Sequence, residues 1–349
     1  MKKIILIFAL LLLAGCDEQR DLYVRVPSTI VVEGDWMPSL GLSDMTMNAT
    51  AVAYNASGQA AMSYFSRANS TSLSLQRGTY DIMIFNGLMY SETETHLDDI
   101  FFRNTGQIGT FEAVAAEATP SKRLARAEDE YIASNNMELF TSAVQELAVV
   151  GDNGYYVKYV DGENGTDIPP SYVEAEIALT PVAMNFKCQV IGTFDNISSA
   201  WSASAALHGF VGSAFVHTRT PSHFYATHQF ILNSKRMLPG YEDRGTIESP
   251  VFITFGPPVD VADKTYSVFV SITLGDGTKW EETVDVTDQV VPVIEKIKQN
   301  IAGTAHEQIT ITIYIDLGLH ELPVIEFHDG SIGVGDWEDD EIIHVPIRP

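Results

Sequence analysis

The fold is decided by the stretch Ser72-Leu-Ser-Leu-Gln-Arg-Gly-Thr-Tyr-Asp-Ile-Met-Ile-Phe-Asn86. Leucine alternates with serine in the run 72–75, a second run at 79–86 is mostly apolar, and the short segment Gln76-Arg77-Gly78 lies between them. Alternation is the period of a β-strand that turns one face to a core, and glycine suits the turn between two strands. The stretch therefore predicts two strands joined by a tight turn.

Short runs of this kind recur along the chain and are separated by Gly, Asn, Asp and Pro. This pattern is typical of antiparallel sheets packed as β-sandwiches, so we predict an all-β fold with one or two short helices. Further strands are expected at 22–26, 29–33, 46–54 and 100–102 in the first half. In the second half they are expected at 174–179, 182–191, 204–218, 227–232, 251–255, 266–274, 279–286, 308–317, 330–333 and 342–347.

Two segments depart from the strand pattern. Residues 288–301 carry apolar side chains on one helical face and begin with Asp288, which can cap a helix, so we predict a helix packed on a sheet. Residues 119–136 are charged and alanine-rich, which indicates a surface helix or loop.

The domain boundary is predicted in the loop 161–167 and at Pro169-Pro170, because consecutive prolines stiffen a chain and do not fit a central strand. We therefore expect one β domain at 22–165 and a second at 166–349.

The N-terminus has the pattern of a bacterial export signal. Lys2 and Lys3 precede ten uncharged residues, 4–13, a run too short to span a bilayer, and Leu13-Ala-Gly-Cys16 follows. Small residues before a cysteine are typical of a lipobox. We predict a lipoprotein signal peptide at 1–15, lipidation of Cys16 and a short charged tether at 16–21.

The charge of the chain excludes some partners. The formal net charge is −25, and removal of the signal with Lys2 and Lys3 makes it −27. So acidic a surface repels phosphate backbones, and nucleic acid is not an expected partner. If Cys16 carries lipid, Cys188 is without an intrachain partner; its apolar neighbours Met184 and Phe186 at alternate positions predict a buried, inert thiol.

Patterns that carry chemistry are weak. The acidic loop 161–167 resembles the start of a calcium-binding loop. Counted from Asp161, the twelfth position is Tyr172, where a calcium loop has its bidentate carboxylate. Four histidines, at 208, 217, 223 and 228, lack the spacing of a known zinc site, and we expect the last three to be solvated in a surface loop. The chain also lacks a nucleophile elbow and a phosphate-binding glycine loop. We predict no enzyme activity, no metal and no cofactor.

The stretch 72–86 resembles the strand pair Leu-x-x-Gly-x-Tyr-x-apolar-x-apolar-Phe/Tyr-Asn of fimbrillin-like lipoproteins from Bacteroidales. The stretches 136–142, 205–213 and 330–337 are also similar to this family, so the resemblance covers most of the chain.

This resemblance implies two tandem transthyretin-like Greek-key β-sandwich domains attached by lipid to the outer membrane, surface-exposed, with a role in fimbriae or cell adhesion. Its implied partners are fimbrial subunits, joined by strand exchange, and host or bacterial surface ligands. Stalk subunits of the family are cut after an early arginine; Arg123 and Arg126 lie late in the first domain, which favours an anchor, accessory or tip subunit. The segment 341–349 is either a donor strand or the last strand of its own sheet.

A surface glycan-binding lipoprotein is the alternative interpretation. It requires a flat aromatic platform, for which Trp36, Trp201, Phe224 and Tyr225 are the candidates. Packing in a core explains the same aromatic residues more simply.

Overall fold

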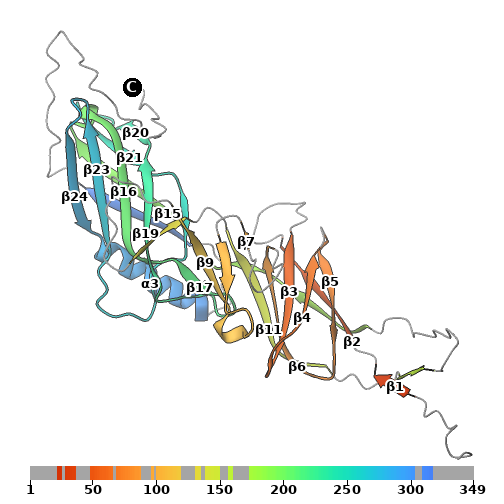
Figure 1. Ribbon diagram of the computed structural model, residues 1–349. Coiled ribbons are helices and arrows are strands. Elements are labelled where there is room, and N and C mark those ends of the chain that lie inside the picture. The colour runs from red at the N-terminus through yellow and green to blue at the C-terminus, as the bar shows by residue number, and fades with distance from the viewer. Residues whose placement is uncertain are drawn as a thin grey trace, which may run out of the picture.

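The computed structural model describes residues 22–25, 28–36, 48–65, 68–87, 96–97, 100–118, 130–134, 138–149, 156–159, 173–302 and 309–316. These residues form several β-sheets and one α-helix, so the predicted all-β fold class is confirmed (Figure 1). The sheets are arranged along an elongated molecule, with β1 at one end and the hairpin of β23 and β24 at the other.

Two sheets of the first half face each other. The larger sheet has the order β14(Val182–Ala183)-β11(Phe140–Val149)-β6(Gly78–Asn86)-β3(Ala49–Asn55)-β4(Gly58–Phe65). The smaller has the order β13(Val173–Leu179)-β2(Ser28–Gly34)-β5(Ser70–Leu75), and a separate pair joins β1(Leu22–Arg25) to β12(Tyr156–Tyr159). The predicted strands 72–75 and 79–86 are β5 and β6, but they pair with β2 and with β3 and β11, not with each other.

The second half is built from two further sheets. The longest follows the order β18(Thr220–Pro221)-β17(Ser213–Phe215)-β9(Glu112–Glu117)-β10(Tyr131–Ser134)-β19(Tyr225–Leu232)-β16(Ala200–Val211)-β23(Ser267–Leu274)-β24(Lys279–Asp285), with β8(Ile100–Arg103) on β9 and β7(His96–Leu97) on β8. The other follows β20(Ser234–Met237)-β21(Arg244–Glu248)-β15(Phe186–Asp195)-β22(Phe252–Thr254), and β25(Thr310–Asp316) pairs with β15. Short 3₁₀ helices lie at Ile108–Thr110 and Ile197–Ser199.

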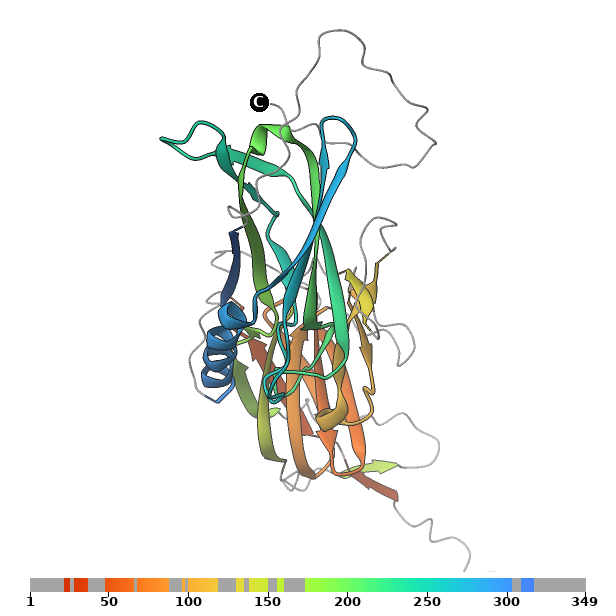
Figure 2. The ribbon, with the colours of Figure 1, turned by 90° about the vertical axis from the view of Figure 1, so that its left-hand side faces the viewer.

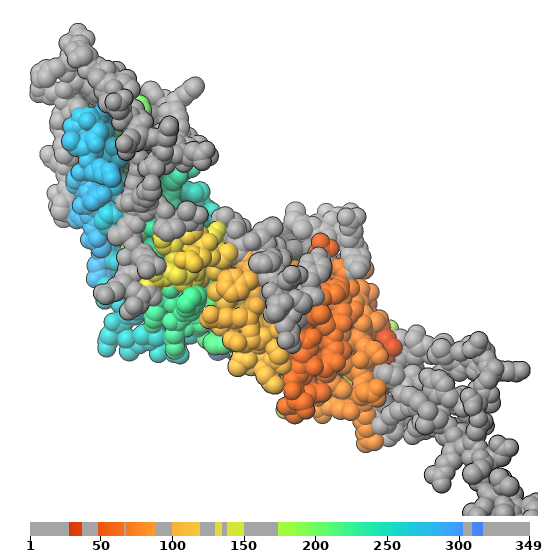
Figure 3. Space-filling view, viewed as in Figure 1, coloured from red at the N-terminus to blue at the C-terminus, as the bar shows by residue number. Residues whose placement is uncertain are grey.

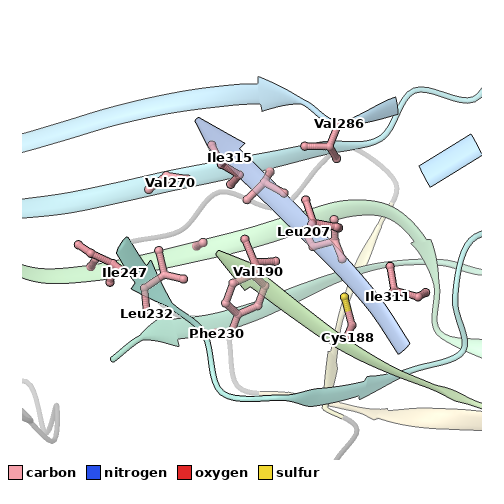
Figure 4. Close-up of a cluster of buried hydrophobic side chains, with 14 of the residues drawn as sticks. Cys188, Val190, Leu207, Phe230, Leu232, Ile247, Val270, Val286, Ile311 and Ile315 are labelled. Carbon is pink, nitrogen blue, oxygen red and sulfur yellow. The ribbon is translucent and has the colours of Figure 1, made fainter. Parts of the chain in front are cut away.

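Three apolar clusters form the core. One lies between the two sheets of the first half and includes Ile82 and Ile84, whereas Met83 and Phe85 of the same strand point the other way, into a second cluster. That second cluster combines Phe85 with residues of the second half such as Val211. The third fills the second half, and Figure 4 shows part of it, around Cys188.

The predicted helix is confirmed as α3(Thr287–Ala302), one residue longer at each end. Its buried face consists of Val290, Ile294 and Ile297, which pack into the cluster of the second half. Asp288 lies inside the first turn rather than at the cap; Asp285 instead accepts a hydrogen bond from the backbone N–H of Thr287 at 2.8 Å.

The predicted turn at 274–278 is also confirmed. The N–H of Leu274 donates to the carbonyl of Thr278 at 2.8 Å, and Gly277 at φ +83° closes the turn between β23 and β24. The strands β4, β9, β11, β12, β20 and β21 were not predicted as strands by the sequence pattern.

The interpretation of residues 119–136 as a surface helix or loop is wrong for its described part. Residues 131–134 form β10, which pairs in parallel with β19 and antiparallel with β9. Ile132 and Ala133 are buried in this position. Pairing to strands distant in sequence therefore outweighs the local preference of this segment.

Strand pairings cross the predicted domain boundary in both directions. β13 and β14, which follow residue 165, pair with β2 and β11 of the first half. β9 and β10, which precede it, pair with β17 and β19 of the second half. In Figure 3 the first-half residues, in orange and yellow, lie directly beside second-half residues, in green. The division at residue 165 stays a prediction.

Candidate adhesion and assembly surfaces

Several positions singled out in the sequence lie outside the described residues. They are the lipidation site Cys16, Arg123 and Arg126, the acidic loop 161–167 and the C-terminal segment 341–349. In the described part of the chain, no helix is long and apolar enough to cross a membrane.

The four histidines do not converge on one site. His217 hydrogen-bonds Gln145 at 2.7 Å, and His223 pairs with Asp260 at 2.7 Å. His228 hydrogen-bonds Thr254 at 3.0 Å. Among the described residues no three histidine, cysteine or acidic side chains are placed to share a metal ion.

The expectation that His228 is solvated is wrong. Its ring is buried between Phe210 and Phe252, with ring centroids 6.5 and 5.8 Å away. Burial disfavours the charged imidazolium and lowers the pKa of His228 to about 4. This histidine is therefore a neutral core residue at physiological pH.

The four aromatic candidates for a glycan platform are not brought together. Trp36 is buried against Phe65 in the core of the first half. Phe224 stacks on Tyr131, with ring centroids 4.4 Å apart, and Lys264 lies 3.7 Å above the ring of Tyr225. Trp201 is the most exposed of the four, at 57%, and Phe224 is 39% exposed.

A network of charged and hydroxyl groups fastens the region where the two halves meet. Arg103 on β8 forms two hydrogen bonds with Glu112 on β9, Nε to Oε2 at 2.6 Å and Nη2 to Oε1 at 2.8 Å. Ser213 on β17 donates to the same carboxylate at 2.5 Å and lies 2.5 Å from the hydroxyl of Ser222. The bond to Glu112 raises the pKa of Arg103. A paired guanidinium and carboxylate thus link three strands across the boundary.

A second network anchors the start of β10. The carboxylate of Glu130, buried, accepts hydrogen bonds from the N–H of Gly209 at 3.0 Å and from the hydroxyl of Thr227 at 2.7 Å. His208 lies 3.5 Å from the same carboxylate and 3.0 Å from Thr227. Burial raises the pKa of Glu130, but these donors outweigh it and the net shift of the pKa is downward.

Tyr131, next in sequence, extends this anchor. Its hydroxyl donates to the carbonyl of Gly212 at 2.8 Å and lies 3.3 Å from the carbonyl of Ala115. Arg103 lies over the ring of Phe224, which stacks on Tyr131, so the two networks meet at this aromatic pair. Both buried carboxylates are saturated by donors within the chain, which suits a rigid joint and not a reactive site.

Exposed apolar side chains occur on several elements of the second half. Tyr241, between β20 and β21, is 60% exposed and has Arg244 over its ring at 5.6 Å. The neighbouring 3₁₀ helix is fixed to this hairpin, since Ser198 N–H donates to Asp243 at 2.9 Å. Figure 1 places β20 and β21 toward the end of the molecule opposite β1. Trp201, Ile231 and Met237 are exposed on β16, β19 and β20.

Sequence comparison matches no family model and no curated protein. Among solved structures, a candidate adhesin from Bacteroides ovatus aligns with a TM-score of 0.51 at 12% identity, over 76% of this chain and 85% of that chain. This chain shares the fold of that adhesin.

Two more solved structures align with lower scores, on which we rest no argument. A candidate adhesin from Bacteroides thetaiotaomicron has a TM-score of 0.45 at 8% identity, over 84% of this chain and 93% of that chain. The fimbrial anchor protein Mfa2 from Porphyromonas gingivalis has a TM-score of 0.41 at 11% identity, over 83% and 90%.

Proposed function

We propose that this protein is a non-enzymatic, fimbrillin-like lipoprotein of the outer membrane that acts as an anchor, accessory or tip subunit in fimbrial assembly or cell adhesion. The observation that carries the proposal is the fold shared with the Bacteroides ovatus adhesin candidate along most of both chains. The pattern at 72–86, which becomes β5 and β6, supports it independently.

The arrangement of the chain suits a protein that is held at one end and makes contact at the other. β1 begins at Leu22, six residues after the proposed lipid site Cys16 in the sequence, and lies at one end of the molecule. The hairpin of β20 and β21, which carries the exposed Tyr241 between its strands, lies toward the opposite end (Figure 1). Lipid on Cys16 would anchor the chain to the outer membrane, because an acyl chain binds a bilayer through its buried methylene groups.

The joint between the halves suits the same role. When a surface protein binds a partner at its far end, a mechanical force on that end is transmitted along the whole protein. In this chain the force is transmitted through β9 and β10, which the pairs Arg103–Glu112 and Glu130–Thr227 hold to neighbouring strands. We propose two domains divided near residue 165 that behave mechanically as one body because these strands cross between them.

The proposed partners are other fimbrial subunits, joined by strand exchange, and ligands on host or bacterial surfaces. Glycan binding is the second candidate function, and the exposure of Trp201 and Tyr241, at 57% and 60%, favours it. Exposed aromatic rings offer flat apolar faces to sugar rings. A glycan array with the parent protein and a Trp201→Ala, Tyr241→Ala variant tests this; binding that is equal in both proteins contradicts it.

The main proposal is tested on surface appendages sheared from cells that express the protein. We expect antibody against this chain to detect it in the purified fimbrial fraction, and a deletion strain to lose attachment or to make fimbriae of altered length. Absence from that fraction, together with unchanged attachment and fimbrial length in the deletion strain, contradicts the proposal.

A further inference from the structure

The side-chain amide of Gln289 on α3 hydrogen-bonds the backbone of the edge strand β25. Its Nε2 donates to the carbonyl of Tyr314 on β25 at 2.6 Å, and the N–H of Tyr314 donates to its Oε1 at 2.8 Å. A side-chain amide thus makes both hydrogen bonds that a neighbouring strand would make with this residue. Figure 2 shows the blue helix α3 close to the dark blue strand β25.

The other edge of β25 is already in use. The strand pairs in parallel with β15, from Thr310 with Lys187 to Asp316 with Thr193. In a β-strand the N–H and C=O of one residue point to the same side, and successive residues alternate. Thr310 and Thr312 therefore present their backbone groups to the same outer edge as Tyr314. No strand among the described residues pairs with that edge.

The sequence of this edge is complementary to itself. In Thr310-Ile-Thr-Ile-Tyr-Ile-Asp316, an antiparallel copy centred on Ile313 would place Thr312 opposite Tyr314. Asp316 would then oppose Thr310 rather than another acid, which avoids repulsion between like charges. Isoleucine, threonine and tyrosine all favour strands, and a twofold pairing of identical edges closes on itself as a dimer.

We propose that the outer edge of β25 is a pairing surface for a second copy of this chain, and that Gln289 keeps it closed. While the amide is bound to Tyr314, an incoming strand finds the central position of the edge occupied. Open edge strands promote association between proteins, and blocking one is a common protection against it. Release of Gln289 frees the outer edge of β25 at Thr310, Thr312 and Tyr314, where a second β25 fits.

The test is the oligomeric state of the secreted polypeptide from Asp17 onward with Gln289→Ala. Neither copy then has to give up the two neutral hydrogen bonds to Tyr314, which is worth about 30-fold for each copy and lowers the dimer dissociation constant about 1,000-fold relative to the parent protein. Light scattering across a concentration series measures it. The matched control is Gln299→Ala, an exposed glutamine of the same helix, which we expect to behave as the parent protein does.

Two further variants separate this role from simple fastening of the helix. Thr312→Pro in the Gln289→Ala background removes one N–H from the outer edge, where proline is tolerated, and we expect it to restore the monomer. If Gln289→Ala does not fold, Gln289→Glu keeps the size of the side chain, loses the donor, and is measured instead.

Because the polypeptide from Asp17 onward has a formal net charge of −27, the dimer is expected to strengthen as salt is added. A folded Gln289→Ala protein that stays monomeric at high concentration and high salt overturns the proposal. So does a dimer that persists with Thr312→Pro, because it would then form through another surface.

Discussion

Acid should destabilise the protein through His228, because this imidazole is neutral and buried in the folded state. The folded pKa is about 4, whereas the pKa in the unfolded chain is the ordinary value of 6.5. The unfolded state therefore binds a proton first as the pH falls, and the stability that His228 contributes is complete above pH 6.5 and is lost toward pH 4. A difference of about 2.5 pKa units corresponds to about 3 kcal/mol.

The assay is urea unfolding of the parent protein and of His228→Gln between pH 7 and pH 4. The glutamine cannot take up a proton but can still hydrogen-bond Thr254. From the two pKa values, the parent should lose about 2 kcal/mol more than the variant by pH 5 and about 3 kcal/mol more by pH 4. Glu130, whose pKa is lowered, adds a loss at still lower pH in both proteins. Parallel pH profiles for the two proteins would refute the reasoning.

Three further predictions concern the joint and the core. Glu112→Gln should lower the free energy of unfolding by about 1–2 kcal/mol in urea titration, since it leaves Arg103, 38% exposed, without its carboxylate; an unchanged midpoint counts against the joint. Gly209→Ala should lower the free energy of unfolding by about 1–3 kcal/mol, because φ is +88° and a Cβ would lie 2.8 Å from the carbonyl oxygen of residue 265. Gly240→Ala, at φ +87° with open space around the Cβ, should lower it less, and equal losses of stability in the two variants would contradict this. Cys188, fully buried and with a raised pKa, should react with maleimide only after unfolding, and rapid labelling of the native protein would show that the core is open.

Much of the fold could be predicted because it depends on neighbours in sequence. β6 has a continuous apolar run, Ile82-Met-Ile-Phe85, and begins with a glycine, and α3 repeats its apolar face every three or four residues. β10 gave no such signal, since its four residues are held by β19 and β9 and by the anchor at Glu130. Which strands pair across long stretches of chain is a property of the whole core and not of a local pattern.

The candidate site was harder to predict than the fold. Residues that bind metals or activate nucleophiles have recognisable spacings in a sequence, whereas the polar groups that matter here, Glu112 and Glu130, bind other parts of the chain. Glu112 did carry a signal, because it lies between Phe111 and Ala113 in an apolar run, where an acid is expected only with a partner. In so acidic a chain that signal is easily overlooked.

The central claim, a lipid-anchored protein on the cell surface, is tested most directly by protease treatment of intact cells. We expect the chain of the parent strain to be membrane-associated and digested by external protease, and Cys16→Ala to abolish membrane association. Protection in intact cells with digestion only after lysis, or membrane association that survives Cys16→Ala, would contradict the account.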